Sequence, residues 1–362
     1  MNNPEVTKPT ILVTGATGFI GSHTVVELLA AGYRVLMLDN LCNSDASVVE
    51  RIERIAQDQL STQPQRLSFH EMDVRDTESL NRLFKAEPID GVIHFAGLKA
   101  VGESFSQAWD YWNNNVAGTI ALTGVMKDAG VKRLVFSSSA LVYGAARIFP
   151  IKEDAPTQVT NPYGRTKLVC EQFLTELCQS SDDWQVALLR YFNPVGAHKT
   201  ALIGEAPRGV PNNLMPFVTQ VAAGIRPALS VFGRDYPTRD GTCIRDYIHV
   251  CDLAKGHVAT MGAMLGQASP SSVPILKGLA VLNFGTGQGV TVQELVDTFV
   301  RVTGQAVPVM DAPRRMGDVP ELYADPSLAQ ETLGWRAQES LESMCRDAWA
   351  WQSSQSSKGD GV

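Results

Sequence analysis

The sequence predicts an α/β protein: a doubly wound parallel sheet followed by a smaller, mixed α/β C-terminal substrate domain. First, short apolar runs alternate with amphipathic stretches of helical length, which is typical of a parallel sheet covered by helices on both faces. Second, a glycine-rich turn joins the first apolar run to the first amphipathic stretch. Third, the alternation stops after Arg190, and proline and glycine become frequent over residues 194–241. We therefore expect a first domain over residues 1–192, with a returning segment near 244–268, and a second domain over residues 193–362 that ends in a flexible tail.

The expected elements of the first domain follow from its apolar runs and their flanking residues. Thr10–Thr14 is a β-branched run that ends in the glycine turn, and residues 19–31 show a helical periodicity that Gly32 ends. Residues 33–38 form a second apolar strand, which ends at Asp39. The further strands expected are 91–95, 133–136 and 185–189, and the amphipathic helices expected are 79–86, 115–129 and 163–179.

The composition limits the classes of partner. The 362 residues include 31 Lys and Arg against 38 Asp and Glu, a formal net charge of −7. This charge argues against a general nucleic-acid or anionic-membrane surface, because both partners are polyanions. No apolar run approaches the ~18 residues of a membrane span, and residues 1–9 lack the apolar core of a secretory signal. The six cysteines show no metal-ligand spacing, so we expect reduced thiols, a cytoplasmic protein and no metal site.

The first chemical motif is the glycine turn after the first strand. Glycine allows positive φ and close backbone approach, so a pyrophosphate can lie against the N–H groups at the start of the next helix. The spacing of Gly15, Gly18 and Gly21 is GxxGxxG rather than GxGxxG, and alone it also fits a plain strand–helix turn. Asp39 favours a Rossmann-like dinucleotide site, because its carboxylate can accept both adenosine ribose hydroxyls. It would repel a 2′-phosphate, which predicts NAD rather than NADP.

The second motif is a tyrosine–lysine pair at a predicted helix start. Asn161 suits the N-cap, Pro162 suits the first helical position, and Tyr163 and Lys167 then share one helix face. Alone, such a pair is common and also fits an exposed helix start. Beside NAD it suits a general base, although ionising a tyrosine near neutrality requires its pKa to fall about three units. An ammonium group and an oxidised nicotinamide both favour the ionised form.

The third motif is a serine run, Ser137–Ser139, at the carboxyl end of a predicted central strand. Ligands of open α/β sheets bind outside these strand ends. A hydroxyl here could hydrogen-bond a reacting alcohol and relay its proton to the tyrosine. The run could also simply cap the strand-to-helix loop.

Taken together, these motifs resemble the extended short-chain dehydrogenase/reductase family and, within it, the UDP-hexose 4-epimerases. The resemblance runs from about Thr10 to Trp351. It implies reversible C4 epimerisation of UDP-galactose and UDP-glucose through a transient 4-keto sugar, using tightly bound NAD in carbohydrate metabolism. Its most specific segments are 14–23 (TGATGFIGSH), 38–44 (LDNLCNS), 94–104 (HFAGLKAVGES), 191–197 (YFNPVGA), 211–216 (PNNLMP) and 245–250 (RDYIHV).

The same resemblance implies site residues in three groups. The catalytic group is Tyr163 as base, Lys167 beside the nicotinamide ribose and Ser139 bridging the sugar 4-oxygen and the tyrosine. The cofactor group is Gly15, Gly18, Phe19, Ile20, Gly21, Asp39, Asn40, Asn43, Ser44, Asp73, Val74, Phe95, Ala96, Gly97, Lys99, Asn114, Tyr163, Lys167 and Phe192. The substrate group is Ser139, Tyr163, Asn193, Asn213, Leu214, Phe232, Arg245, Arg315 and Leu322, in which the two arginines would pair with the diphosphate.

The chain departs from the family pattern at two positions. Leu141 stands where relatives usually carry threonine, which makes Ser139 the more important hydroxyl near the sugar. Leu322 stands at a size-gating position, so acceptance of N-acetylated UDP-hexoses stays open.

Three alternative functions remain at this point. A nucleotide-sugar 4,6-dehydratase would need Asp-Glu after the serine run, where Ala140 and Leu141 stand, and a reductase would favour NADP, against Asp39. A redox-sensing NAD-binding regulator would lack the tyrosine–lysine pair. The resemblance also implies a homodimer formed through residues 107–129 and 163–179.

Overall fold

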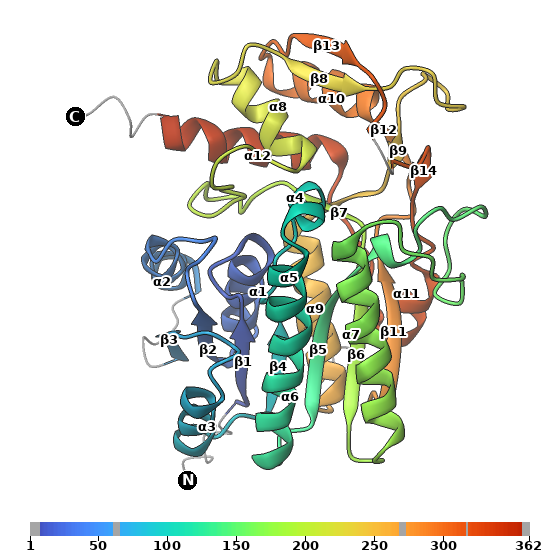
Figure 1. Cartoon of the computed structure of the whole chain (residues 1–362). Helices are drawn as coiled ribbons and strands as arrows, with labels where there is room; N and C mark the ends of the chain where they lie inside the picture. Colours follow the sequence, from blue (N-terminus) through green and yellow to red (C-terminus); the bar gives the residue numbers. More distant parts are fainter. Residues whose placement is uncertain (1–7, 61–65, 268–272, 316–317, 357–362) are drawn as a thin grey trace.

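The computed structural model describes residues 8–60, 66–267, 273–315 and 318–356. Its larger domain is built on seven parallel strands in the order β11-β6-β5-β4-β1-β2-β3, which confirms the predicted doubly wound sheet (Figure 1). The strand order reverses between β1 and β4, where ligands of such sheets bind. The strands are β1 (Thr10–Thr14), β2 (Arg34–Asp39), β3 (Leu67–Glu71), β4 (Gly91–His94), β5 (Arg133–Ser139), β6 (Gln185–Tyr191) and β11 (Gly278–Phe284).

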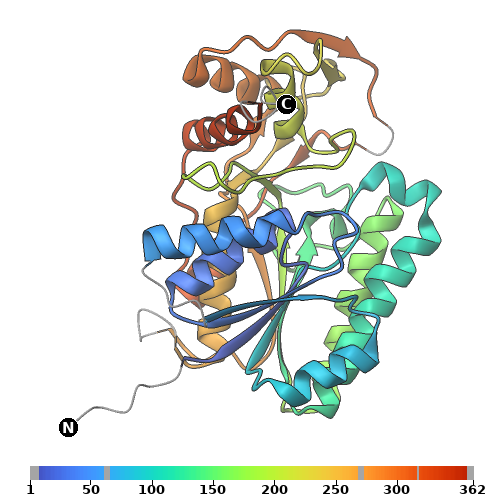
Figure 2. The ribbon, with the colours of Figure 1, turned by 90° about the vertical axis from the view of Figure 1, so that its left-hand side faces the viewer.

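Helices cover both faces of this sheet, as Figure 2 shows from the side. Helices α1 (Phe19–Ala30), α2 (Ser47–Leu60) and α9 (Val250–Met264) cover one face. Helices α3 (Thr77–Ala86), α6 (Gly118–Asp128) and α7 (Pro162–Gln179) cover the other. Three short segments precede α6: α4 (Val101–Ser106), α5 (Ala108–Tyr111) and the π-helix η2 (Trp112–Ala117).

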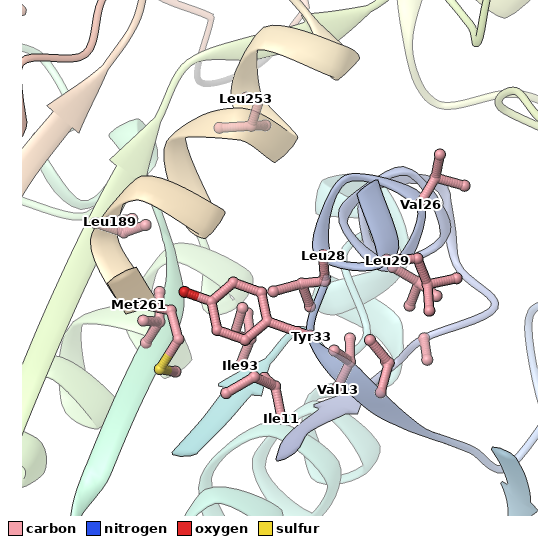
Figure 3. Packing of buried hydrophobic residues seen from close by; sticks show 14 of the residues in the cluster. Ile11, Val13, Val26, Leu28, Leu29, Tyr33, Ile93, Leu189, Leu253 and Met261 are labelled. Atoms are coloured by element: carbon pink, nitrogen blue, oxygen red, sulfur yellow. The ribbon is translucent and has the colours of Figure 1, made fainter. Parts of the chain in front are cut away.

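The core is divided by the sheet because successive strand residues point to opposite faces. In β1, Ile11 and Val13 belong to the cluster on the α1 and α9 side, whereas Leu12 belongs to the cluster on the α7 side. Figure 3 shows the first cluster, in which the Tyr33 ring lies among strand and helix side chains and close to Met261 of α9. Helices and packed side chains therefore cover both faces of the sheet, which leaves the carboxyl ends of the strands as the place where a ligand can bind.

The second domain stands over the carboxyl ends of the strands (Figure 1). Its core lies mainly between α8 (Leu214–Ala222), α10 (Val292–Thr303) and α12 (Leu341–Ser356), beside the parallel pair β8 (Leu229–Phe232) and β13 (Val309–Ala312). The other short strands are β7 (Asn193–Val195), which pairs with β10 (Tyr247–His249), and β9 (Ile244–Arg245), which pairs with β12 (Val290–Thr291) and β14 (Glu321–Leu322).

Two chain segments lie near the predicted domain ends. After the expected returning segment near 244–268, β11 also joins the sheet, because it pairs with β6 along seven residues, and α11 (Ser327–Leu333) packs near it. At the C-terminal end, where a flexible tail was expected, α12 continues to Ser356, and residues 357–362 lie outside the described residues. Helix α2 and strand β3 were not predicted. No helix in the described ranges has the length and apolar character needed to cross a membrane.

Candidate active site

A single cleft of about 1330 Å³ runs between the two domains, at the carboxyl ends of the strands. This volume exceeds the ~300–1,000 Å³ of common small-ligand pockets. Residues of the glycine turn line one part of it, and residues from β9 and β14 line another. The cleft therefore has room for two nucleotide-sized ligands, one on each domain.

The glycine turn shapes the cofactor side of the cleft. Gly15 has φ 66°, and a Cβ there would lie 2.6 Å from the backbone nitrogen of Ala96, so only glycine fits. Gly18 is the N-cap of α1 and offers no side chain to the helix N–H groups. Gly18 and Phe19 line the cleft, which leaves the positive end of α1 suited to bind a diphosphate.

Asp39 provides a fixed acceptor at the end of β2. Its Oδ2 accepts the backbone N–H of Thr17 at 3.0 Å, and its Oδ1 accepts from Leu41 N and Ser44 Oγ, each at 3.0 Å. These bonds orient a carboxylate that lines the cleft. The arrangement fits the two hydroxyls of an adenosine ribose.

The tyrosine–lysine pair lies at the start of α7, as the sequence predicts. The Asn161 side chain accepts the N–H of Gly164 at 2.8 Å, which caps the helix, and Pro162 occupies its first turn. Tyr163 is 9% exposed and Lys167 4% exposed, and both line the cleft. The Lys167 ammonium donates to the carbonyl of Ser137 at 2.7 Å, which fixes it beneath the strand end.

Ser139 completes this group from the end of β5. Its hydroxyl hydrogen-bonds with Tyr163 and accepts the N–H of Leu141 at 3.2 Å. The serine thus caps the short helix η3 (Ala140–Val142) and also contacts the tyrosine. A capping role and a role beside the tyrosine, the two interpretations of the serine run, are therefore compatible.

Burial dominates the electrostatics of the pair. Burial raises the pKa of Tyr163 to about 12, although the hydrogen bond with Ser139 opposes this, and burial lowers the pKa of Lys167 to about 8. We expected Lys167 and an oxidised nicotinamide together to lower the pKa of Tyr163, and this stays a prediction for the protein with bound cofactor. In the protein by itself, desolvation of the phenolate outweighs the hydrogen bond with Ser139. Tyr163 is protonated at neutral pH unless a ligand adds positive charge.

The opposite wall carries the predicted diphosphate arginines. Arg245 donates to the carbonyl of Val319 at 2.9 Å and pairs with Asp318 at 2.9 Å. The Arg315 guanidinium carbon lies 3.9 Å from the centre of the Phe232 ring. Leu322 is the register partner of Arg245 in the β14–β9 pair, so the size-gating position lies next to an arginine that lines the cleft.

All the predicted site residues line the cleft except Asp73. The Asp73 carboxylate instead binds Arg75 through two oxygens and accepts from Asn40 Nδ2 at 2.9 Å. The hydrogen bonds from Arg75 hold the pKa of Asp73 well below its usual range. Its side chain is therefore occupied within its own loop, while the neighbouring Val74 lines the cleft.

Among the cleft residues that the sequence prediction did not include are the charged or aromatic side chains of Arg51, Glu205, Arg208 and Trp351. Two of them stand in the glycine- and proline-rich stretch after β7, where charged residues between prolines were the available signal. In the described ranges, no group of three or more His, Cys, Asp or Glu side chains could hold a metal ion.

Comparisons with known proteins identify the family. The chain matches the family described as GDP-mannose 4,6 dehydratase over residues 12–348. It is 51% identical to the UDP-glucose 4-epimerase of Bacillus subtilis, over 95% of this chain and 97% of that protein. Its fold matches a UDP-glucose 4-epimerase from Stenotrophomonas maltophilia with bound NAD and formylated UDP-arabinopyranose, at TM-score 0.91 and 50% identity over 97% of this chain and 99% of that one. The chain belongs to the UDP-glucose 4-epimerase family, within the extended short-chain dehydrogenases/reductases.

A second solved relative supports this placement in the UDP-glucose 4-epimerase family. The enzyme from Bifidobacterium longum, in complex with NAD⁺ and UDP, superimposes at TM-score 0.88 with 44% identity over 96% of this chain and 99% of that one. A more distant UDP-Glc/GlcNAc 4-epimerase from Campylobacter jejuni matches at TM-score 0.79 and 32% identity, over 96% of this chain and 99% of that one.

In this member of the UDP-glucose 4-epimerase family, a buried ion pair lies one helical turn beyond Lys167. Glu171 of α7 pairs with Arg190 of β6 at 2.6 Å, and both side chains are less than a tenth exposed. Glu171 also accepts the hydroxyl of Ser138 on β5, and Arg190 donates to Tyr143 at 3.1 Å. This network joins the helix that carries Tyr163 to two strands of the sheet.

Proposed function

We propose that the protein interconverts UDP-galactose and UDP-glucose by inverting C4 of the hexose through a transient 4-keto sugar, using tightly bound NAD. The observation that carries this proposal is one cleft with two complementary walls. Tyr163, Lys167 and Ser139 line the first wall, and Arg245 and Arg315 line the second. A redox centre thus faces an anchor for a diphosphate.

NAD fits the first wall. The glycine turn and the open N-terminus of α1 would hold its diphosphate, and the oriented Asp39 carboxylate would accept the adenosine ribose hydroxyls. Lys167 would donate to the nicotinamide ribose, because its buried ammonium already points to the strand ends. When bound, NAD would supply the hydride chemistry. It would accept a hydride from C4 of the hexose and return it to the opposite face of the same carbon.

The protein's own groups move the proton. Ser139 would hydrogen-bond the sugar 4-oxygen, and Tyr163 would take the hydroxyl proton as C4 is oxidised and return it as C4 is reduced. Burial alone keeps the Tyr163 phenol protonated, so ionisation needs positive charge nearby. An oxidised nicotinamide would add its positive charge to that of Lys167, and together they would favour the phenolate. Tyr163 ends each cycle in the state in which it began.

Inversion at C4 also requires the hexose to turn within the cleft. Arg245 and Arg315 would grip the diphosphate, with Asn193, Asn213 and Leu214 beside the nucleotide. Arg245 is already held by Asp318 and the carbonyl of Val319, so its position is fixed before the substrate arrives. Binding energy from the nucleotide would then position a sugar that makes fewer contacts of its own.

The direct test is to incubate the purified protein with UDP-galactose without adding NAD. We expect conversion to the equilibrium mixture with UDP-glucose, because the cofactor stays bound through turnover. Absence of any conversion in protein shown to contain NAD would refute the proposal.

Two related activities deserve a comparison. An N-acetylhexosamine 4-epimerase activity depends on the space beside Leu322, which packs with Val142 and Phe192, and an assay of UDP-N-acetylgalactosamine against UDP-galactose decides it. A dehydratase activity is suggested by the family description. It would need acid and base groups after the serine run, where the chain has Ala140 and Leu141.

We further propose a homodimer in the cytoplasm. Large apolar side chains are exposed within residues 107–129, a segment expected to form the interface: Trp109 of α5, Trp112 of η2 and Ile120 of α6. Phe105 of α4 is exposed just before this segment. A second copy of the chain would cover them. All six cysteines lie within the described ranges as free thiols, which suits a reducing compartment.

A further inference from the structure

A loop of the second domain, residues 204–211, reaches across to the NAD-binding domain. It connects β7 to α8 and runs between the two domains below α12 (Figure 1). Five consecutive residues of it, 204–208, line the same cleft as Gly18 and Asp39. We call residues 204–211 the strap. Two contacts connect it to the first domain, each on a different element, and a third packs it against α12 of its own domain.

The first contact is made by Arg208. Its guanidinium donates to the carbonyls of Cys42 (3.4 Å) and Ser44. Both carbonyls belong to the loop that follows Asp39, and the hydroxyl of Ser44 is itself bound to Asp39. Arg208 therefore binds the strap to the rim of the cleft on the adenosine ribose side.

The second contact is made by Glu205 on the opposite rim. Its Oε1 accepts from the ammonium of Lys99, in the loop after β4, at 2.9 Å. The same oxygen accepts from Asn213 Nδ2 at 2.6 Å. A carboxylate between two anionic ligands would be unfavourable unless it were paired, and this pairing also connects the cofactor loop to the substrate domain.

The third contact stiffens the base of the strap. A Cβ on Gly204 would lie 2.4 Å from the Trp351 ring, so the backbone of the strap packs directly on that ring. The Trp351 indole N–H donates to the carbonyl of Glu205 at 3.2 Å. The Arg51 guanidinium of α2 lies 5.5 Å from the centre of the same ring.

We propose that the strap retains the cofactor, with Arg208 and Glu205 as positioning residues that hold it across the mouth of the NAD site. The proposal rests on the proposed function, because an enzyme that returns the same hydride must keep its cofactor between the two half-reactions. The strap comes from the second domain and contacts both rims of the site. A dinucleotide beneath it could leave only after Arg208 or Glu205 releases its partner.

The test measures cofactor exchange rather than turnover. The full-length protein is loaded with unlabelled NAD and mixed with isotopically labelled NAD, without a sugar nucleotide, and retained label is counted after rapid gel filtration. Arg208→Ala should exchange roughly tenfold faster than the wild type, since it loses two hydrogen bonds from a charged donor. Arg208→Lys should be intermediate, because an ammonium keeps the charge but loses the planar fork. Glu205→Gln should also exchange faster.

The matched control is Arg301→Ala, which removes an exposed arginine of the same domain that pairs with Glu342, away from the cleft. It should exchange at the wild-type rate. Saturating NAD should return Arg208→Ala to wild-type turnover, which a general loss of structure would not allow. The proposal is overturned if Arg208→Ala and Glu205→Gln both exchange at the wild-type rate, or if Arg301→Ala exchanges as fast as Arg208→Ala. A wild type that retains NAD but does not epimerise would refute the proposed function alone.

Discussion

Tyr163, Lys167 and Ser139 lie together because the start of α7 meets the end of β5. The first two turns of α7 carry the tyrosine and the lysine, and the last residue of β5 is the serine. Ser139 hydrogen-bonds Tyr163, and Lys167 donates to Ser137 on the same strand. Tyr163 and Ser139 are thus held by contact with each other, and Lys167 is held by its contact with the strand that carries Ser139.

Replacing Tyr163 by phenylalanine tests the proposed base. Tyr163→Phe should lower turnover by about 10²–10⁴-fold, the range that a positioned acid–base group contributes, and leave the content of bound NAD unchanged. Tyr33→Phe is the control, because Tyr33 is a buried tyrosine in the core of the same domain and does not line the cleft. Near-normal activity of Tyr163→Phe would remove this residue as the base.

Burial of Lys167 gives a pH-dependent prediction. Its pKa is lowered from 10.5 to about 8, so between these values the unfolded chain still binds a proton that the folded protein has released. Stability therefore rises with pH over this window, and below about pH 8 the contribution is constant. Relative to Lys167→Met, the wild type should gain about 3 kcal/mol between pH 8 and 10.5.

The measurement is urea unfolding of both proteins with matched NAD content. Comparison with the variant cancels the other groups that titrate in this range. A free-energy difference that stays constant or falls with pH would show that the lysine is not desolvated.

The residue scale also shows what sequence could and could not predict. Asp39, Tyr163 and Lys167 were found because each stands at a fixed offset from a glycine turn or a helix start. Glu205 and Arg208 were not, because their partners lie more than a hundred positions away along the chain and the strap has no periodic pattern.

At the scale of elements, α7 carries the proposed catalytic pair and also braces the sheet. Tyr163, Lys167 and Glu171 follow at intervals of four, so one helix face presents all three. The first two line the cleft, and the third binds Arg190 and Ser138 beneath it. This arrangement fixes the depth at which the helix lies against β5 and β6.

Breaking the brace should be costly. Glu171→Gln leaves the Arg190 guanidinium buried without its counter-charge, and we expect a loss of about 3–5 kcal/mol in the free energy of unfolding. Glu342→Gln, which breaks the exposed pair with Arg301, should cost about 0–1 kcal/mol. Urea denaturation of the two variants gives both values, and equal costs would contradict the role assigned to Glu171.

Element boundaries were predictable where a local signal existed. Asn161 and Pro162 predicted the start of α7 correctly, and the cap is formed as expected. Strand β3 was not predicted from the sequence, because it is an edge strand and none of its side chains is fully buried. Strand β11 joins the sheet beside β6, almost a hundred residues earlier in the chain, and no local pattern indicates such a pairing.

On the scale of the whole molecule, both ligands that we propose for this acidic protein are themselves acidic. The net charge of −7 is a sum over the whole chain, whereas the cleft gathers the cations Lys99, Lys167, Arg245 and Arg315 and the N-terminus of α1. Two domains are needed because each supplies one wall. The strap reaches from the second domain to the first, and the returning segment α9–β11 leads the chain back to the sheet of the first domain.

The proposed dimer gives a prediction at the same scale. Trp109 is 73% exposed on α5, within the segment expected to form the interface. Trp109→Glu should convert the dimer to a monomer, because a charge would replace a large apolar contact. Ile148→Glu, at a position 81% exposed elsewhere, is the control and should stay dimeric. Light scattering after gel filtration gives both masses, and an unchanged mass for Trp109→Glu would exclude this surface.

The central claim is that one hydride leaves C4 and returns to it within a closed cleft. The most direct measurement uses UDP-galactose that carries deuterium at C4, converted by the purified protein in ordinary water without added NAD. We expect UDP-glucose that retains the deuterium at C4. Product that has lost the label to solvent would contradict the account, because it would mean that C4 is inverted by proton exchange with water and not by hydride transfer to a retained cofactor.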